Sequence, residues 1–406
     1  MQIELSGKSV LLAVTGSISV YKACDLARLF VKAGADVHVV MTPAAERFVS
    51  VLTFEALTRN PVLTEQSESW SSALNHIDIG KKCDVCIIAP ATANTLNKIS
   101  HGFADNILTQ TLLAFKGEIL LAPAANTQML ANYASVKNLT LLKEQGYVVI
   151  TPQEKLLACG DVGSGALAEP SEIFFETARV LLKEDFWLDR PVVVTGGGSR
   201  EKIDEVRYLS NFSSGKMAKS LSLALYLKGA KVHYITSMGN ESLPLAITSE
   251  HFEDAEELLA ITQKSLDSHV KHTKEPYLFM VAAVADFKPK SAKKGKIKKS
   301  SLAETWDIEL IQNPDILSNL DRDSVTTIAF KAEMDSQEGL NNAVKLLSQK
   351  RVDAVCYNLL QDAKSFGGDE NEITFITKES QIPLGRADKL RLSNKILTEA
   401  KVLSHE

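Results

Sequence analysis

The chain has 406 residues, of which 45% are hydrophobic and 23% charged, and its formal net charge is −5. This length is enough for two or three domains, and the composition excludes disordered, collagen-like and coiled-coil proteins. The mildly acidic balance argues against binding to nucleic acid or an anionic membrane. No apolar run reaches the about 18 residues of a membrane span, and the N-terminus leads into a strand pattern without a signal peptide, so we expect a cytoplasmic protein.

The first 41 residues contain a strand, a glycine–serine turn, an amphipathic helix and a second strand, and the same order recurs from Arg190. The two second strands begin with the related sequences GADVHVV (34–40) and GAKVHYI (229–235). Such units open parallel sheets that helices cover. Further strands are predicted at Asp84–Ala89, Glu118–Ala122, Val148–Thr151, Tyr277–Ala283, Thr326–Phe330, Ala354–Tyr357 and Ile373–Thr377.

These patterns predict an α/β protein with two tandem three-layer Rossmann-like domains and mostly parallel sheets. A helical pattern ends and charges cluster at KEDFWLDRP (183–191), where Pro191 precedes a new strand. We therefore expect one domain over residues 1–186 and another over 187–406.

Cys83 and Cys86 form a C-x-x-C pair within a segment that has the pattern of a buried strand. Residues three apart in a strand point to opposite faces, which is incompatible with disulfide or metal geometry. We therefore predict no redox motif there, and five scattered cysteines predict no disulfide framework.

Small polar residues follow the predicted strands of the first half. The loop Thr15-Gly16-Ser17-Ile18-Ser19 precedes a helix and offers backbone N–H groups to an anion such as a phosphate. The segments PATANT (90–95) and PAANTQM (123–129) lie at the carboxyl edge of a parallel sheet, where ligands bind. The loop is not G-x-G-x-x-G and no acidic residue ends the second strand, which disfavours NAD.

With NHIDIG (75–80) and the glycine-dense loop ACGDVGSG (158–165), these segments resemble the flavin-dependent cysteine decarboxylase family over residues 5 to 180. The resemblance implies an acylated cysteine substrate, whose thiol carbon flavin oxidises to a thioaldehyde before CO₂ leaves. The implied FMN-binding residues are Gly16, Ser17, Thr42, Pro90, Ala91, Thr92, Ala93, Asn94 and Thr95.

The same resemblance implies three catalytic residues. His76 would act as a base or orient the thiol, and Asn126 would bind the substrate carboxylate. Cys159 would protonate the enethiolate from a mobile, glycine-hinged flap. Ala125 and Ala166 stand where the family usually has Met and Arg.

In the second half, Ser210 to Gly215 precede a helix and suit a phosphate. The lysine-rich run KPKSAKKGKIKK (288–299) is either a solvated loop or a lid that brings positive charge to a triphosphate. No aromatic residues are interleaved with these lysines, which disfavours single-stranded nucleic acid as their ligand.

This half resembles the phosphopantothenate–cysteine ligase family over residues 190 to 400. The matching segments are TGGGSREKIDEVRYLSNFSSGKM, AAVADF, KIKK, NPDIL, AFKAE and FGGDENEITFI. The implied reaction activates 4′-phosphopantothenate with CTP, and L-cysteine then attacks the acyl-cytidylate to give 4′-phosphopantothenoylcysteine. The chain as a whole thus resembles the bacterial family of bifunctional coenzyme A biosynthesis enzymes, which implies trimers through the flavin domain and dimers through the ligase domain.

The ligase resemblance also implies residue roles. Asn211 would hold the acyl-cytidylate, Arg207 would act in the step with cysteine, and Lys296 would reach the triphosphate. Mg²⁺ would bind through the phosphates. The implied nucleotide-binding residues are Ala282, Ala283, Asp286, Lys296, Asn313, Pro314, Asp315, Ile316, Phe330, Lys345 and Lys350.

Two alternatives stay open. A tandem Rossmann NAD(P) oxidoreductase would explain the Tyr-x-x-x-Lys match at Tyr133 and Lys137, but the missing acidic residue counts against it. A catalytically inactive flavin-binding regulatory protein would not need a proton donor or a lid lysine. The retained set is His76, Asn126, Cys159, Arg207, Asn211 and Lys296.

Overall fold

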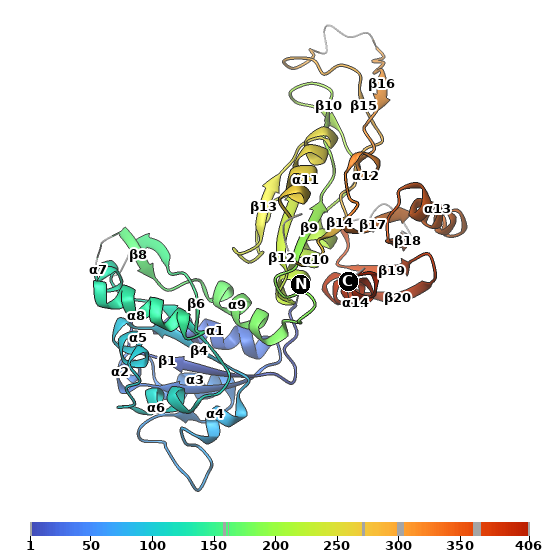
Figure 1. Ribbon diagram of the computed structural model, residues 1–406. Coiled ribbons are helices and arrows are strands. Elements are labelled where there is room, and N and C mark those ends of the chain that lie inside the picture. The colour runs from blue at the N-terminus through green and yellow to red at the C-terminus, as the bar shows by residue number, and fades with distance from the viewer. Residues whose placement is uncertain are drawn as a thin grey trace. The chain divides into compact units, whose positions relative to one another are not determined.

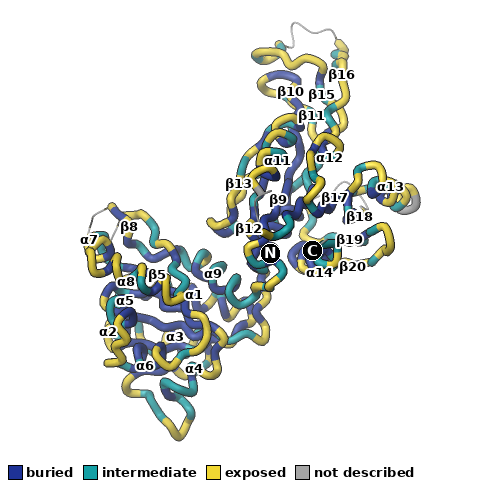
Figure 2. Tube along the Cα trace, in the orientation of Figure 1, coloured by how far each residue is buried: buried dark blue, intermediate teal, exposed yellow. Residues whose placement is uncertain are grey.

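The computed structural model describes residues 2–156, 160, 162–269, 273–298, 304–359 and 367–404. It divides into two compact units, Gln2–Leu182 and Lys183–Glu406 (Figure 1). In both units the central strands of the main sheet are buried and the outward faces of the helices are exposed, as Figure 2 shows. No helix in these described ranges is both long and apolar enough to cross a membrane.

The first unit contains a six-stranded sheet in the order β3-β2-β1-β4-β5-β6, in which every pair is parallel. Because helices cover both faces, the strands are almost continuously apolar, as in β1. The order reverses between β1 and β4, which creates the crevice where ligands of such sheets bind. The strands are β1 (Ser9–Val14), β2 (Asp36–Met41), β3 (Val62–Leu63), β4 (Val85–Ala91), β5 (Glu118–Pro123) and β6 (Val148–Val149).

Helices α1 and α9 pack together on one face of this sheet, and α5 packs with α6 and α8 on the other. In α1 the buried residues recur every three to four positions, and Phe30 meets Phe174 of α9 with 5.3 Å between ring centroids. The helices are α1 (Val20–Lys32), α2 (Pro43–Glu46), α3 (Val51–Thr58), α4 (Asp78–Lys82), α5 (Ala93–Ser100), α6 (Ile107–Ala114), α7 (Thr127–Ala131), α8 (Tyr133–Glu144) and α9 (Pro170–Leu182). An antiparallel hairpin, β7 (Gln153–Leu156) and β8 (Val162–Ala166), precedes α9.

The second unit repeats the strand order of the first and adds two antiparallel strands at one edge. Its sheet runs β13-β12-β9-β14-β17-β18-β19-β20. The α/β prediction with mostly parallel sheets is therefore confirmed in both halves. The strands are β9 (Pro191–Gly196), β12 (Lys231–Thr236), β13 (Thr248–His251), β14 (Tyr277–Met280), β17 (Thr326–Glu333), β18 (Ala354–Leu359), β19 (Glu370–Ile376) and β20 (Gln381–Asp388).

Helices α10 and α14 pack on one face of the second sheet, and α11, α12 and α13 lie on the other. These helices are α10 (Lys216–Leu227), α11 (Ala255–His269), α12 (Ile316–Asn319), α13 (Ser336–Gln349) and α14 (Lys389–Ala400). Two short antiparallel pairs project from the end of this unit and are called the arm below (Figure 1). The arm consists of β10 (Glu201–Lys202), β11 (Tyr208–Leu209), β15 (Phe287–Pro289), β16 (Leu310–Gln312) and their connecting loops.

The geometry expected for the C-x-x-C pair is wrong. Cys83 precedes β4 rather than lying in it, and both cysteines pack into the same hydrophobic cluster. Both thiols are free. Burial raises the pKa of Cys83 to about 12 and that of Cys86 well above its usual value, so both are apolar core residues with little thiolate.

Glu184 ties the start of the second unit to two later segments, because Lys228 and Lys401 both donate to its carboxylate. Burial raises the pKa of Glu184, but these two hydrogen bonds outweigh it and leave the pKa below its usual value. A lowered folded-state pKa gives stability that is present above the unfolded pKa, about 4.3, and is lost as pH falls through the folded value.

We therefore expect Glu184→Gln to reduce the free energy of unfolding by about 1 kcal/mol at pH 7, with the difference shrinking below about pH 4. Urea denaturation at pH 7 and at a pH below about 4 measures this difference in the free energy of unfolding. Asp189→Asn, which alters the exposed Asp189–Lys231 pair, is the control and should have a smaller effect. An equal loss at both pH values would show that the carboxylate charge is not responsible.

Candidate functional site

A cavity of about 510 Å³ opens where β1, β2, β4 and β5 end in the first unit. Its walls are the loops and helix starts that follow these parallel strands, as expected for a ligand site of this fold. The lining residues are Gly16, Ser17, Thr42, Pro43, Ala44, Thr92, Ala93, Asn94, Thr95, Lys98, Asn106, Ala124, Ala125 and Met129.

Seven of the nine residues that the sequence suggested for FMN line this cavity, namely Gly16, Ser17, Thr42, Thr92, Ala93, Asn94 and Thr95. Pro90 and Ala91 are instead buried at the end of β4. Sequence reasoning missed Lys98 and Asn106, although Lys98 lies one turn beyond Asn94 on α5 and helical spacing could have indicated it.

Short hydrogen bonds join the loops around the cavity. The Thr15 hydroxyl donates to the Pro90 carbonyl at 2.6 Å and accepts from the Thr92 amide at 3.1 Å. Thr92 also caps α5, because its hydroxyl accepts from the Thr95 amide. Gly16 lets the first two loops meet, since a Cβ there would lie 2.5 Å from the Ala44 Cβ.

The polar groups around this cavity suit an anion. Helix α1, of 13 residues, begins after Ser19 without a side-chain cap. Its Val20 and Lys22 amides donate to the carbonyls of Ser17 and Ser19, so the helix attracts an anion through the positive end of its dipole. Lys98 contributes a positive charge to the lining and is held 2.5 Å from Asp105. Apart from Met129, Asn94 and Asn106, the rest of the lining is small or hydroxylic and leaves room for a planar heterocycle.

His76 is positioned by two residues that the sequence did not single out. Its Nδ1 lies 2.7 Å from the Glu68 carboxylate, and its ring meets Trp70 edge-on at 5.6 Å between centroids. Trp70 is 65% exposed. The three residues lie in the segment between β3 and α4, outside the cavity lining. No sequence motif joins Glu68 to His76, so only the fold identifies this pair.

Asn126 lies directly after the cavity residue Ala125 and caps α7 by accepting from the Gln128 amide at 2.8 Å. The hairpin β7–β8 packs on this segment, where the Ala125 amide donates to the Gly165 carbonyl at 3.1 Å. Cys159, between the two strands of the hairpin, lies outside the described residues.

Two glycines of β8 allow this close contact. A Cβ on Gly165 would lie 2.1 Å from the Ala125 carbonyl oxygen, and one on Gly163 would lie 2.1 Å from the Thr127 hydroxyl. The sequence suggested hinge glycines, but these two serve close packing within a strand. Glu169 adds ionic contacts to Lys155 of β7 and Lys22 of α1, and the hydrogen bond from Lys155 lowers the pKa of Glu169.

A second cavity, of about 590 Å³, lies in the second unit around the carboxyl ends of β9, β14, β17 and β18. Five suggested residues line it: Asn211, Ala282, Ala283, Asp286 and Phe330. The other lining residues are Gly197, Ser210, Phe212, Ser213, Ser214, Gly215, Lys216, Met217, Ala218, Val281, Val284, Lys331, Ala332, Asn358, Asn371, Ile373 and Lys389.

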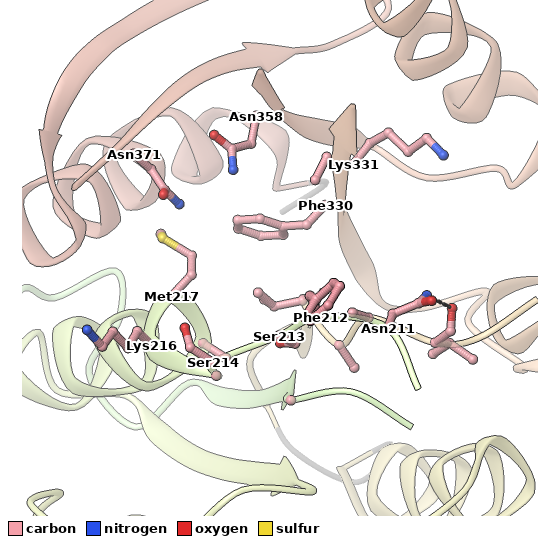
Figure 3. Close-up of a pocket in the computed structure, with 18 of the residues that line it drawn as sticks. Asn211, Phe212, Ser213, Ser214, Lys216, Met217, Phe330, Lys331, Asn358 and Asn371 are labelled. Carbon is pink, nitrogen blue, oxygen red and sulfur yellow. Dashed lines mark hydrogen bonds between the residues drawn. The ribbon is translucent and has the colours of Figure 1, made fainter. Parts of the chain in front are cut away.

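Figure 3 shows the Phe330 ring in the middle of this cavity, with Asn358 and Asn371 on one side and Asn211 on the other. The Asn211 amide donates to the Val284 carbonyl at 2.9 Å. Lys216 donates to the Gly367 carbonyl at 2.9 Å and to Asp369 at 2.7 Å.

Lys389 is almost fully buried beside Lys216 and donates to the Gly368 carbonyl. Burial, and then the nearby Lys216 charge, lower the pKa of Lys389. Sequence reasoning missed Lys216, Asn358, Asn371 and Lys389. Lys216 and Asn371 lie within the SSGKM and FGGDEN segments, which could have indicated them, whereas Asn358 and Lys389 carry no such signal.

Seven suggested nucleotide-binding residues, Lys296 included, are not among the lining residues. The Asn313 backbone N–H donates to the carbonyl of the lining residue Asp286 at 2.9 Å, and its side-chain amide donates to the Ala285 carbonyl at 2.7 Å. Its Oδ1 is buried and has no hydrogen-bond partner among the described residues. Pro314 and Ile316 flank Asp315, which caps α12 and pairs with Lys350. Lys345 is exposed on α13.

Arg207 and Lys296 lie together on the arm rather than in the cavity lining. The Arg207 guanidinium donates to Asp204 at 2.6 and 3.1 Å and to the Ile297 carbonyl at 2.9 Å. Its other contact is the Trp306 ring, 4.7 Å from the centroid. Lys296 is exposed next to Ile297. No set of three or more His, Cys, Asp or Glu side chains in the described ranges is arranged to hold a metal ion.

Comparison with known proteins finds two matching families. Residues 2–182 match the family described as "Flavoprotein", and residues 187–403 match the "DNA/pantothenate metabolism flavoprotein C-terminal domain". The coenzyme A biosynthesis bifunctional protein CoaBC of Haemophilus influenzae is 36% identical over 405 residues, which cover 98% of both chains. That of Bacillus subtilis is 36% identical over 418 residues, covering 99% of this chain and 98% of the relative.

Among solved structures, the FMN-dependent cysteine decarboxylase TvaF from thioviridamide biosynthesis is 35% identical. The match covers 36% of this chain and 91% of that chain, with a TM-score of 0.34.

Proposed function

The chain belongs to the family of coenzyme A biosynthesis bifunctional proteins, and from this premise we propose the two reactions that its two cavities perform. The second unit joins 4′-phosphopantothenate to L-cysteine at the expense of CTP. The first unit decarboxylates the resulting 4′-phosphopantothenoylcysteine to 4′-phosphopantetheine with FMN. The supporting observation is that one chain carries a cavity suited to a flavin and a separate one suited to a nucleotide, on the two units that match the two families.

The residues of the first cavity fit FMN. The uncapped start of α1 and the nearby Ser17 suit the phosphate, while Thr92, Asn94 and Thr95 offer polar groups to the ring system. The absence of a Cβ on Gly16 lets this loop pack directly on Ala44, which sets the spacing of the two loops that line the cavity. When bound, FMN supplies the two-electron oxidation that makes loss of CO₂ from the cysteine carboxylate feasible.

The chain's own groups then bind the carboxylate and move protons. The Glu68 carboxylate next to Nδ1 of His76 favours the tautomer with a proton on Nδ1, which makes Nε2 the base for the substrate thiol. Asn126 binds the carboxylate without adding a charge, and this interaction is lost as CO₂ leaves. Cys159 donates the proton to the product carbon.

In the second cavity, Ser213, Ser214 and the start of α10 suit the phosphates of CTP, because this helix begins at Gly215 without a side-chain cap. Asp286 and Phe330 hold the cytidine, together with the turn that begins at Asn313, whose backbone N–H donates to the Asp286 carbonyl. Lys296 and Arg207 act in the first and second steps. Mg²⁺ would be held mainly by the phosphate oxygens of CTP and would neutralise part of their charge.

Gly16→Ala tests the two halves in one experiment. The added Cβ would overlap Ala44, so we expect bound FMN and decarboxylation to fall at least about tenfold, while CTP-dependent ligation by the other unit is unchanged. The measurements are the visible flavin absorption, the FMN released on heating, and pyrophosphate formation. Gly80→Ala is the control, because a Cβ there would make only an ordinary contact at 3.6 Å with Phe115.

Wild-type protein that is colourless and does not take up added FMN would contradict the decarboxylase proposal and leave the ligase proposal standing. Conversely, failure to release pyrophosphate from CTP in the presence of 4′-phosphopantothenate would contradict the ligase proposal alone.

A further inference from the structure

We propose that Asp204 is a positioning residue for ligation, which fixes Arg207 and the segment carrying Lys296 in one arrangement, so that both steps depend on a single carboxylate. This inference rests on the proposed function, because it takes its two steps from the roles of Lys296 and Arg207.

The Asp204 side chain is fully buried and is saturated with hydrogen bonds. Its Oδ1 accepts from the amides of Val206 and Arg207, both at 2.8 Å. Its Oδ2 accepts from the Arg207 guanidinium at 2.6 and 3.1 Å and from the Ile297 amide at 3.1 Å. The Arg207 hydrogen bonds keep the pKa of Asp204 far below its usual range, so the carboxylate is charged at any pH of interest.

Through these bonds Asp204 joins two segments that are about ninety residues apart in sequence. The Lys293 amide donates to the Ile203 carbonyl at 3.0 Å, and Asp204 and Lys293 form a parallel bridge. Residues 293–297 thus run beside residues 203–207. Lys296 directly precedes Ile297, whose amide donates to Asp204.

The arm depends on this carboxylate because it has few buried apolar residues. Among its described residues, the buried apolar ones are Ile203 and Pro289, whereas Val206, Tyr208, Leu310 and Ile311 are exposed. The hydrogen bonds that Arg207 and Ile297 donate to the buried Asp204 carboxylate are therefore a main source of order in the arm. The positive groups stay reachable, since the Arg207 side chain is 37% exposed and Lys296 is exposed.

The test compares single-turnover rates of the two steps in purified full-length variants. Lys296→Gln should slow pyrophosphate release, and Arg207→Gln should slow the cysteine-dependent consumption of the acyl-cytidylate. Asp204→Asn keeps the size of the side chain but removes its charge, and we expect it to slow both steps at least about tenfold, because small displacements of catalytic groups have large rate effects. Glu309→Gln, which alters the exposed Lys290–Glu309 pair on the same arm, should leave both rates within about twofold.

Two further readouts separate positioning from loss of structure. CTP affinity of Asp204→Asn should stay within about twofold of wild type, because Asp204 is outside the cavity lining, and Tm should fall by less than about 4 °C. If Asp204→Asn does not fold, Ile297→Pro removes one N–H donor to Asp204 and leaves Arg207 in place, and should slow pyrophosphate release at least about threefold.

Normal rates for both steps in Asp204→Asn, with Lys296→Gln and Arg207→Gln behaving as described, would overturn the inference about Asp204 alone. If Lys296→Gln and Arg207→Gln leave their steps unchanged, the roles in the proposed function fail and the inference fails with them. A loss of CTP affinity equal to the loss of rate would show a structural role instead of positioning.

Discussion

Gly165→Ala is expected to reduce decarboxylation at least about 100-fold while FMN stays bound. The added Cβ would lie 2.1 Å from the Ala125 carbonyl oxygen, and this is a backbone atom that cannot rotate away. Either β8 must lift from the Ala125–Asn126 segment, or this segment must move. In both cases Asn126 and the hairpin that bears Cys159 lose their mutual arrangement.

Gly163→Ala should have a smaller effect at the same hairpin, because its Cβ would meet the Thr127 hydroxyl, a side-chain atom that can turn aside. The measurement is CO₂ release from 4′-phosphopantothenoylcysteine, together with the flavin absorption spectrum of each variant. Gly80→Ala again serves as the matched control. Normal turnover by Gly165→Ala would show that contact between the hairpin and Ala125 is not needed for catalysis.

Lys296→Gln is expected to reduce pyrophosphate release about 100- to 1,000-fold, the size of effect found when a group that stabilises transition-state charge is removed. Negative charge develops on the leaving pyrophosphate during activation, and the Lys296 ammonium would stabilise it. Glutamine keeps most of the length and the polarity of the side chain but has no charge, so the change isolates electrostatics.

Lys294→Gln is the matched control, because Lys294 is an exposed lysine on the same segment and has no assigned role. Pyrophosphate release by Lys294→Gln should stay within about twofold of wild type, because salt in the solvent screens the charge of an exposed lysine that does not contact the triphosphate. Equal losses in the two variants would indicate a general requirement for positive charge on the arm. An unchanged rate in Lys296→Gln would contradict its assigned role.

Most of the suggested site residues that line a cavity lie in loops that directly follow a strand. The family resemblance implied Gly16, Thr42, Thr92 and Asn94, and in the structure these residues line one cavity, because parallel strands direct their following loops to one edge. The resemblance also implied Asn211, Ala282, Asp286 and Phe330, which line the second cavity. Pro90 and Ala91 were implied with the first set but lie buried at the end of β4, because a motif along the chain does not show where a buried strand ends.

The sequence did not reveal pairs of residues that no local pattern relates. Glu68 beside His76 depends on the folding of an irregular segment, and Lys389 reaches Lys216 only because α14 packs against α10. In the sequence, nothing distinguishes Asp204 from an ordinary aspartate in a surface loop. Its contact with Ile297 depends on two segments of the arm pairing side by side.

The sequence by itself therefore determined the two mostly parallel sheets, their order along the chain and the loops that line each cavity, because hydrophobic periodicity and glycine-rich turns are local properties. Tertiary structure alone decided which of these groups meet. Gly165 contacts Ala125, and Asp204 holds Arg207 and Ile297, through packing and hydrogen bonds between segments that no local pattern relates.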